Sequence, residues 1–231
     1  MVNAARSSEL NANFYAVRHP LSIHNRIPQR FQSSDASLSK LGYMQAHQTA
    51  MFFKRRLEGS KLIIVSSDTK RTRQTTGIFT DMMKPLIEEV IYDDRIRERD
   101  PGTRLHGLEM PLDTLNERQI DAMVVGAGGE SMRQLWNRVN DFVIGIKAES
   151  SRLNGFSIII VTHEFPLKAM AGISTGQGME ESIFNGNRFC FKNASISTGV
   201  ITPSTFRFQN LGDTSHLAKM LPTKTTSSYS K

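Results

Sequence analysis

Two apolar segments of this chain each lead into a histidine, and they constrain the fold more than any other feature. Residues 14–17 are apolar and are closely followed by His19 and Pro20. Residues 157–162 are rich in β-branched side chains, and His163 follows them directly. Short apolar runs of this kind favour buried strands, and a proline cannot continue a sheet ladder. Ligands of open α/β sheets bind at the carboxyl ends of such strands, so we expect both histidines to line one pocket.

Strand-like and helix-like segments alternate along the rest of the chain. The apolar patterns predict strands at residues 14–17, 62–65, 87–92, 157–162, 189–191, 195–202 and 206–210, and helices at 68–83, 115–125, 131–148 and 166–171. A further helix is expected to start after Ser37 or Ser39 and to end near Leu57. Asp68 is a suitable N-cap for the helix that follows it. This alternation predicts an α/β fold, a three-layer α/β/α sandwich with a mostly parallel sheet.

The length of 231 residues fits a single domain over residues 1–231, with a short cap insertion at about 103–129 and a loose tail at about 218–231. Apolar residues make up 39% of the chain, which is enough for a sizeable core. Cys190 is the single cysteine, so an intrachain disulfide and a Cys-rich metal site are excluded. The sequence has no apolar run typical of a secretory signal or a membrane span, so we expect a cytoplasmic protein. It does not indicate an oligomeric state.

The formal net charge is +7, and many of the cations lie near the expected histidine strands and the segments between them. An anionic ligand or a nucleic acid would each account for such a basic balance. The chain has no RNA-stacking motif, zinc-finger spacing or basic helix with heptads, so a nucleic-acid partner is not expected. The cations that favour an anionic ligand are Arg18, Arg26, Arg30, Lys70, Arg71, Arg73, Arg95, Arg97 and Arg99.

The spacing around the first histidine, Arg18-His19 followed by Ser22 and Asn25, resembles a known signature. It is similar to the Arg-His-Gly motif of the histidine phosphatase superfamily, the phosphoglycerate-mutase-like proteins, with Pro20 in place of glycine. Four more segments resemble motifs of that family in the family's order. They are residues 66–75 with Arg71, 97–102 with Glu98, the Gly-Glu-Ser sequence at 129–131, and 161–163 with His163. Together the five motifs cover about residues 14–202, and with the short expected cap the chain resembles the phosphatase branch of the family.

The resemblance implies a phosphoryl-transfer site and gives these side chains roles in it. His19 would be the nucleophile, because a neutral imidazole can attack phosphorus near pH 7. Arg18, Arg71 and His163 would bind the phosphoryl group through charge-assisted hydrogen bonds. Glu98 would be the proton donor, a role that burial favours by raising the pKa of a carboxyl group. No metal ion or cofactor is expected, and the partner would be a small phosphorylated substrate.

Three further candidates have less certain roles. Ser22 and Asn25 would give neutral hydrogen bonds to the phosphoryl group. Glu164 stands where many members of the family have glycine, and it brings a negative charge close to the expected phosphate. Phytase-like members place their acid just after the second histidine, so Glu164 competes with Glu98 as proton donor. Simpler interpretations are that Ser22 is only a turn residue, Arg71 a surface residue, and Glu98 a salt-bridge partner.

Three functions fit these residues: a phosphomonoesterase, a phosphosugar mutase, and a catalytically weak member that binds phosphorylated ligands or another macromolecule. Pro20, which lacks an N–H, and the acidic Glu164 keep the third function open. The expected cap insertion runs from Thr103 to Gly129, 27 residues, and it carries two arginines against four acidic residues. The insertion of the resembling mutases is long. A short, mildly acidic cap should leave water at the phosphohistidine, so the sequence favours a phosphatase.

Overall fold

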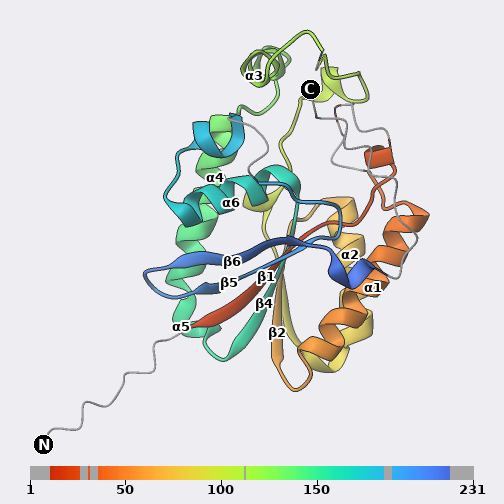
Figure 1. The fold of residues 1–231 in the computed structure, drawn as a ribbon, viewed down its shortest axis with the longest axis vertical. Coiled ribbons are helices and arrows are strands. Elements are labelled where there is room, and N and C mark those ends of the chain that lie inside the picture. The colour runs from red at the N-terminus through yellow and green to blue at the C-terminus, as the bar shows by residue number, and fades with distance from the viewer. Residues whose placement is uncertain (1–10, 27–30, 32–35, 112, 185–188, 219–231) are drawn as a thin grey trace, which may run out of the picture.

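A central mixed sheet with helices on both faces forms the body of the molecule (Figure 1). The computed structural model describes residues 11–26, 31, 36–111, 113–184 and 189–218, so nearly all of the expected loose tail lies outside the described residues. The strands are β1 (Ala12–Arg18), β2 (Lys61–Ser66), β3 (Ile87–Tyr92), β4 (Phe156–Thr162), β5 (Ile196–Ile201) and β6 (Phe206–Asp213).

The strand order is β3-β2-β4-β1-β5-β6. The four strands from β3 to β1 are mutually parallel, while β5 and β6 are antiparallel to their neighbours. The predicted three-layer fold with a mostly parallel sheet is therefore confirmed. Because β1, β2 and β4 are adjacent and parallel, their carboxyl ends lie together at one edge of the sheet.

Helices on the two faces of the sheet come from different parts of the chain (Figure 1). One face is covered by α1 (Lys40–Arg56) and α2 (Lys70–Met83), and the other by α4 (Met132–Ala148), α5 (Ser150–Leu153) and α6 (Glu164–Thr175). A further helix, α3 (Glu117–Gly126), lies away from the sheet (Figure 1). No helix in the described ranges is long and apolar enough to cross a membrane. The cytoplasmic location stays a prediction.

Strand β4 shows why both faces of the sheet need helices. Ile158 and Ile160 pack in the core that α4 and α6 cover, whereas Ile159 and Val161 pack in the core that α1 and α2 cover. Successive side chains of a strand point to opposite faces, so a continuous apolar run is buried only between two layers. All four side chains are 0% exposed, which places β4 at the centre of the sandwich.

Two details of the expected secondary structure are wrong. Asp68 is not a helix cap: α2 begins after Thr69, and the Asp68 carboxylate instead forms an ion pair with Arg97. Residues 189–191 are not a strand, although Phe189 and Phe191 are buried. Their apolar side chains are packed into the core, but their backbone does not pair with a strand of the sheet.

The expected cap insertion, residues 103–129, forms a separate layer above the carboxyl edge of the sheet, and we call it the cap segment (Figure 1). It holds the 3₁₀ turn η4 (Thr103–Leu105) and α3. Ile120 and Val124 of α3 form a small apolar cluster with Phe31, and Leu105 of η4 packs against this cluster. Its two ends meet at their base, because Glu130 N donates to Asp100 O at 2.8 Å. A Cβ atom on Gly102, whose φ is +79°, would lie 2.9 Å from Gly129 N, so the two backbones are in direct contact.

Candidate active site

The two histidines singled out in the sequence lie next to each other. His19 follows β1 and His163 follows β4, and their ring centroids are 5.0 Å apart. Both side chains are buried, at 1% and 0% exposure. The backbone N–H of His19 donates to Thr162 O at 2.9 Å, which extends the β1–β4 pairing to the site. The parallel register therefore places the two imidazoles side by side.

The hydrogen bonds of His19 define which ring nitrogen carries the proton. Its Nδ1 lies 2.7 Å from Pro20 O, and its Nε2 lies 3.0 Å from the Arg71 Nε–H. A carbonyl oxygen can only accept and a guanidinium can only donate, so Nδ1 is protonated and Nε2 holds a lone pair. Burial, together with the charges of Arg71 and Arg18, lowers the pKa of His19 well below its ordinary value. The ring is therefore a neutral imidazole with its Nε2 lone pair against a cation.

Two arginines flank His19. Arg71 lies in the first turn of α2 and is 1% exposed, so the interpretation of it as a surface residue is wrong. Burial lowers its pKa to about 10, and Arg71 remains charged at neutral pH. Arg18 Nη1 lies 2.8 Å from Glu164 Oε2 and also donates to Phe191 O, while its buried Nε has no hydrogen-bond partner among the described residues.

His163 is held by two side chains that sequence reasoning did not select. Its Nε2 lies 2.9 Å from Ser67 Oγ and 3.3 Å from Thr69 Oγ1. Its buried Nδ1 has no hydrogen-bond partner in the described part of the chain, so a ligand atom at this position would satisfy it. Burial and the charge of Arg71 lower the pKa of His163 well below its ordinary value, so the ring is neutral near pH 7.

The two candidate acids, Glu98 and Glu164, have opposite electrostatic environments. The Glu98 carboxylate accepts hydrogen bonds from the backbone N–H groups of Glu164 (3.2 Å), Phe165 (3.3 Å) and Arg99 (3.1 Å). Burial still raises the pKa of Glu98, because it outweighs the nearby Arg71 charge. Burial also acts to raise the pKa of Glu164, but Arg18 and Lys168 outweigh it, and that pKa lies below the ordinary value.

Ser22 and Asn25 bind each other. Ser22 Oγ donates to Asn25 Oδ1 at 2.7 Å, and Asn25 N donates back to Ser22 Oγ at 3.1 Å. The pair forms a closed turn, which agrees with the interpretation of Ser22 as a turn residue. Asn193 Nδ2 donates to His19 O at 3.0 Å, so this asparagine fixes the backbone of the histidine itself.

Sequence reasoning did not find Ser67, Thr69 or Asn193. The first two lie within the segment recognised by its arginine, so the motif contained them without giving them a role. Asn193 follows the residues expected to be a strand and carried no signal. Among the described residues, no group of three or more His, Cys, Asp or Glu side chains could hold a metal ion.

The arrangement supplies a neutral imidazole whose Nε2 lone pair accepts a hydrogen bond from Arg71, two guanidinium groups and a carboxyl group with a raised pKa. Imidazole lone pairs attack electrophilic phosphorus, and paired guanidinium groups bind phosphoryl oxygens through forked hydrogen bonds. The site is therefore suited to phosphoryl transfer through a covalent histidine intermediate.

Comparisons with known proteins agree with this chemistry. The family model of the histidine phosphatase superfamily (branch 1) matches residues 14–214. A relative named probable phosphoglycerate mutase GpmB, from Yersinia pestis, is 29% identical over 221 residues, which cover 88% of this chain and 94% of that protein.

Solved structures of both mutases and phosphatases share the fold. A phosphoglycerate mutase from Bacillus anthracis aligns with a TM-score of 0.73 at 17% identity, over 91% of this chain and 97% of that one. A mycobacterial glucosyl-3-phosphoglycerate phosphatase aligns with a TM-score of 0.62 at 21% identity, over 87% of this chain and 99% of that one. The shared fold therefore does not distinguish a mutase, which transfers the phosphoryl group to a second hydroxyl group, from a phosphatase, which transfers it to water.

Proposed function

Because this chain belongs to the histidine phosphatase superfamily, branch 1, we propose that it is a metal-independent phosphomonoester hydrolase with His19 as its nucleophile. The observation that carries the proposal is the state of His19: the ring is buried and neutral, and its Nε2 lone pair lies 3.0 Å from Arg71 Nε. A phosphoryl group bound between His19 Nε2 and Arg71 Nε would replace this hydrogen bond, and it would contact the nucleophile and a cation at the same time. Pro20 keeps the carbonyl that orients the ring, so the replacement of glycine does not remove this function.

The reaction has two steps that share one carboxyl group. In the first, His19 Nε2 attacks phosphorus, the bond from phosphorus to the ester oxygen breaks, and neutral Glu98 gives its proton to the departing oxygen. In the second, water attacks the phosphohistidine, the Glu98 carboxylate accepts a proton from that water, and the phosphorus–nitrogen bond breaks. Inorganic phosphate leaves, and Glu98 is protonated again. Proton transfer of this kind typically contributes roughly 10²–10⁴-fold to the rate.

We assign the proton donor to Glu98 rather than Glu164. A donor must hold its proton near neutral pH, and the pKa of Glu98 is raised by burial whereas the pKa of Glu164 is lowered by Arg18 and Lys168. Glu164 also forms ion pairs with Arg18 at 2.8 Å and with Lys168 at 3.2 Å, which favour its charged form. Arg18, Arg71 and His163 would bind the phosphoryl oxygens in both steps.

Hydrolysis is preferred over the mutase reaction because the cap segment is poorly suited to hold a second anionic group. The segment contains Arg104 and Arg118 against four acidic residues. Arg118 is already in an ion pair, with Nη2 at 2.7 Å from Glu180 Oε2. A mutase must retain its intermediate and exclude water until the second transfer, and a short acidic cap favours neither. We therefore propose small phosphomonoesters as the substrate class.

The test compares wild-type protein with His19→Ala on p-nitrophenyl phosphate and on a panel of phosphorylated metabolites. We expect phosphate release and an acid-labile, base-stable phosphoenzyme in the wild type, and neither in the variant. Phosphorus NMR with the two phosphoglycerate isomers, with and without bisphosphoglycerate, decides between hydrolysis and isomerisation. Rapid interconversion with negligible free phosphate would identify a mutase, and no turnover of any ester would identify a weak member that only binds its ligands.

A further inference from the structure

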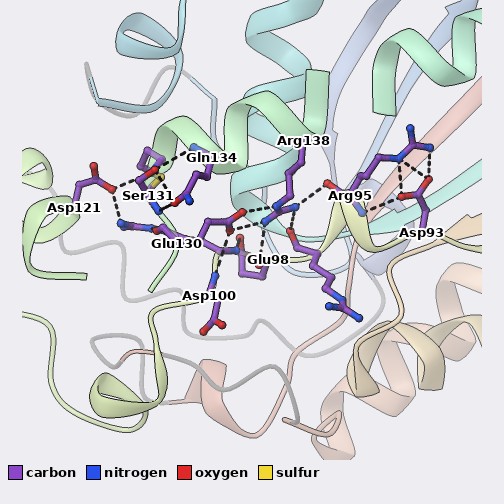
Figure 2. A network of polar contacts seen from close by, with 12 residues as sticks. Asp93, Arg95, Glu98, Asp100, Asp121, Glu130, Ser131, Gln134 and Arg138 are labelled. Atoms are coloured by element: carbon purple, nitrogen blue, oxygen red, sulfur yellow. Dashed lines mark hydrogen bonds and ion pairs between the residues drawn. The ribbon is translucent and has the colours of Figure 1, made fainter. Parts of the chain in front are cut away.

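Arg138, on α4, contacts the backbone of the segment that carries Glu98 (Figure 2). Its Nη1 donates to Arg95 O at 2.7 Å and to Arg97 O at 2.8 Å, and its Nη2 donates to Glu98 O at 3.2 Å. One guanidinium group therefore binds three carbonyl oxygens within four consecutive residues. Neither the sequence motifs nor the proposed reaction gives this arginine a role.

The orientation of Arg138 is itself fixed by Glu130 (Figure 2). The two side chains form a forked ion pair, in which Nε donates to Oε1 and Nη2 donates to Oε2 at 2.8 Å. Their side chains are only 21% and 17% exposed, so the pair is largely shielded from water. Forked pairing restricts the plane of the guanidinium group, unlike a single-point contact. We call these two residues the Arg138–Glu130 clamp.

The segment held by the clamp has little secondary structure of its own. It comprises the short 3₁₀ turn η3 (Asp94–Ile96) and the irregular residues 97–102. Side chains bind several backbone carbonyls of this segment: Thr162 Oγ1 donates to the buried Ile96 O at 2.7 Å, and Arg138 binds the carbonyls on both sides. The position of the Glu98 backbone therefore depends on these side chains.

The carboxyl end of Glu98 is bound separately, by the backbone N–H groups of Glu164 and Phe165 at the start of α6. Its backbone is bound by the clamp on α4. We propose that the Arg138–Glu130 clamp is a positioning device for the proton donor, which sets how far the Glu98 carboxyl group reaches toward the leaving oxygen. This inference rests on the proposed function. A displacement of about 1 Å can reduce the rate of a positioned reaction about 100-fold.

The test is the leaving-group dependence of Arg138→Gln. With an alkyl phosphate such as glycerol phosphate, whose leaving oxygen needs a proton, kcat/KM should fall about 10- to 100-fold. The burst rate of p-nitrophenol release from p-nitrophenyl phosphate should change less than about threefold, because that leaving group needs little protonation. Arg138→Lys keeps the charge but not the fork, so it should show the same pattern. Arg133→Gln removes an exposed arginine from the same helix, and it should leave both substrates unchanged.

A double-mutant cycle with Glu98→Gln separates positioning from a general structural role. If Arg138 acts through Glu98, adding Arg138→Gln to Glu98→Gln should change alkyl phosphate turnover less than about threefold. Equal losses for both substrates, or additive losses in the cycle, would overturn the inference while leaving the proposed function intact. If Glu98→Gln slows alkyl and aryl phosphates equally, Glu98 is not the proton donor, and the inference about Arg138 is wrong as well. Should Arg138→Gln not fold, Arg138→Lys and Glu130→Gln provide the same comparison.

Discussion

Replacing Glu164 with glutamine should strengthen the binding of inorganic phosphate. Glu164 Oε2 lies 2.8 Å from Arg18 Nη1, so its charge offsets a cation that the site would use to bind phosphate. The carboxylate is ionised near neutral pH, because Arg18 and Lys168 hold its pKa below the ordinary value despite burial. The substitution removes this negative charge and preserves the shape of the side chain.

The expected magnitude follows from Coulomb's law. An anion bound on the other side of the Arg18 guanidinium would lie about 6 Å from the Glu164 carboxylate, and at effective dielectric constants of about 80 to 20 the repulsion is about 0.7 to 2.8 kcal/mol per unit charge. Since about 1.4 kcal/mol is a tenfold change in affinity, we expect phosphate to bind roughly 3- to 100-fold more tightly. The Glu164 side chain is 32% exposed, so solvent screening favours the lower half of that range.

The assay is isothermal titration calorimetry of inorganic phosphate at pH 7.5, repeated at increasing salt concentration. Glu89→Gln is the matched control, because Glu89 forms an ion pair with Arg152 on the short helix α5, away from the histidines. The gain in Glu164→Gln should shrink as salt screens the charge. An unchanged or weaker affinity in Glu164→Gln would refute the electrostatic reasoning, and would indicate that Glu164 serves mainly to orient Arg18.

Three further predictions follow from the same site. Glu98→Gln should remove the basic limb of the pH profile of kcat/KM for alkyl phosphates, because neutral Glu98 is lost as pH rises through its raised pKa. If the basic limb persists in the variant, it arises from the ionisation of another group. His163→Asn should weaken the pH dependence of stability. The pKa of His163 is depressed in the folded protein, so its contribution to the free energy of unfolding is full above about pH 6.5. That contribution is lost as pH falls, by at most about 1.4 kcal/mol per pH unit. Urea unfolding at several pH values measures this, and parallel curves for the two proteins would contradict it. Gly42→Ala should lower both stability and activity, since a Cβ there would lie 2.0 Å from Leu21 O, in the loop that follows His19. Thermal unfolding and kcat measure the two effects, and wild-type values for both would contradict the predicted clash.

The elements that follow from local pattern were predictable, and those that depend on a distant partner were not. β3 spans the expected residues 87–92, because its boundary signals are local. Asp68 has the chemistry of a helix cap, but its carboxylate binds Arg97 from another segment, and no local rule anticipates that pairing. Phe189 and Phe191 show a second limit: apolar character predicts burial, which is correct here, but burial does not require a strand.

The same distinction holds within the site. His19 and His163 were expected in one pocket because parallel strands bring their carboxyl ends together, and the structure has their rings 5.0 Å apart. Their catalytic roles remain proposals. Asn193 could not be found in this way, since its hydrogen bond to His19 O joins residues far apart in the sequence. Arg138 could not be found either, because its proposed role rests on three carbonyl oxygens whose positions only the folded chain defines.

The contact between the two ends of the cap segment has a consequence for how such a protein can diversify. Asp100 and Glu130 are joined by a backbone hydrogen bond, and Gly102 lies against Gly129, so the loop between them is already closed at its base. Doubling the length of a flexible loop costs only about 0.6 kcal/mol of closure entropy. The apolar cluster of Phe31, Ile120 and Val124 is also distinct from the two cores beside the sheet. Insertions or deletions between residues 103 and 129 that keep Asp121, which pairs with Arg99 beside Glu98, could therefore change substrate choice without moving the residues below the cap segment.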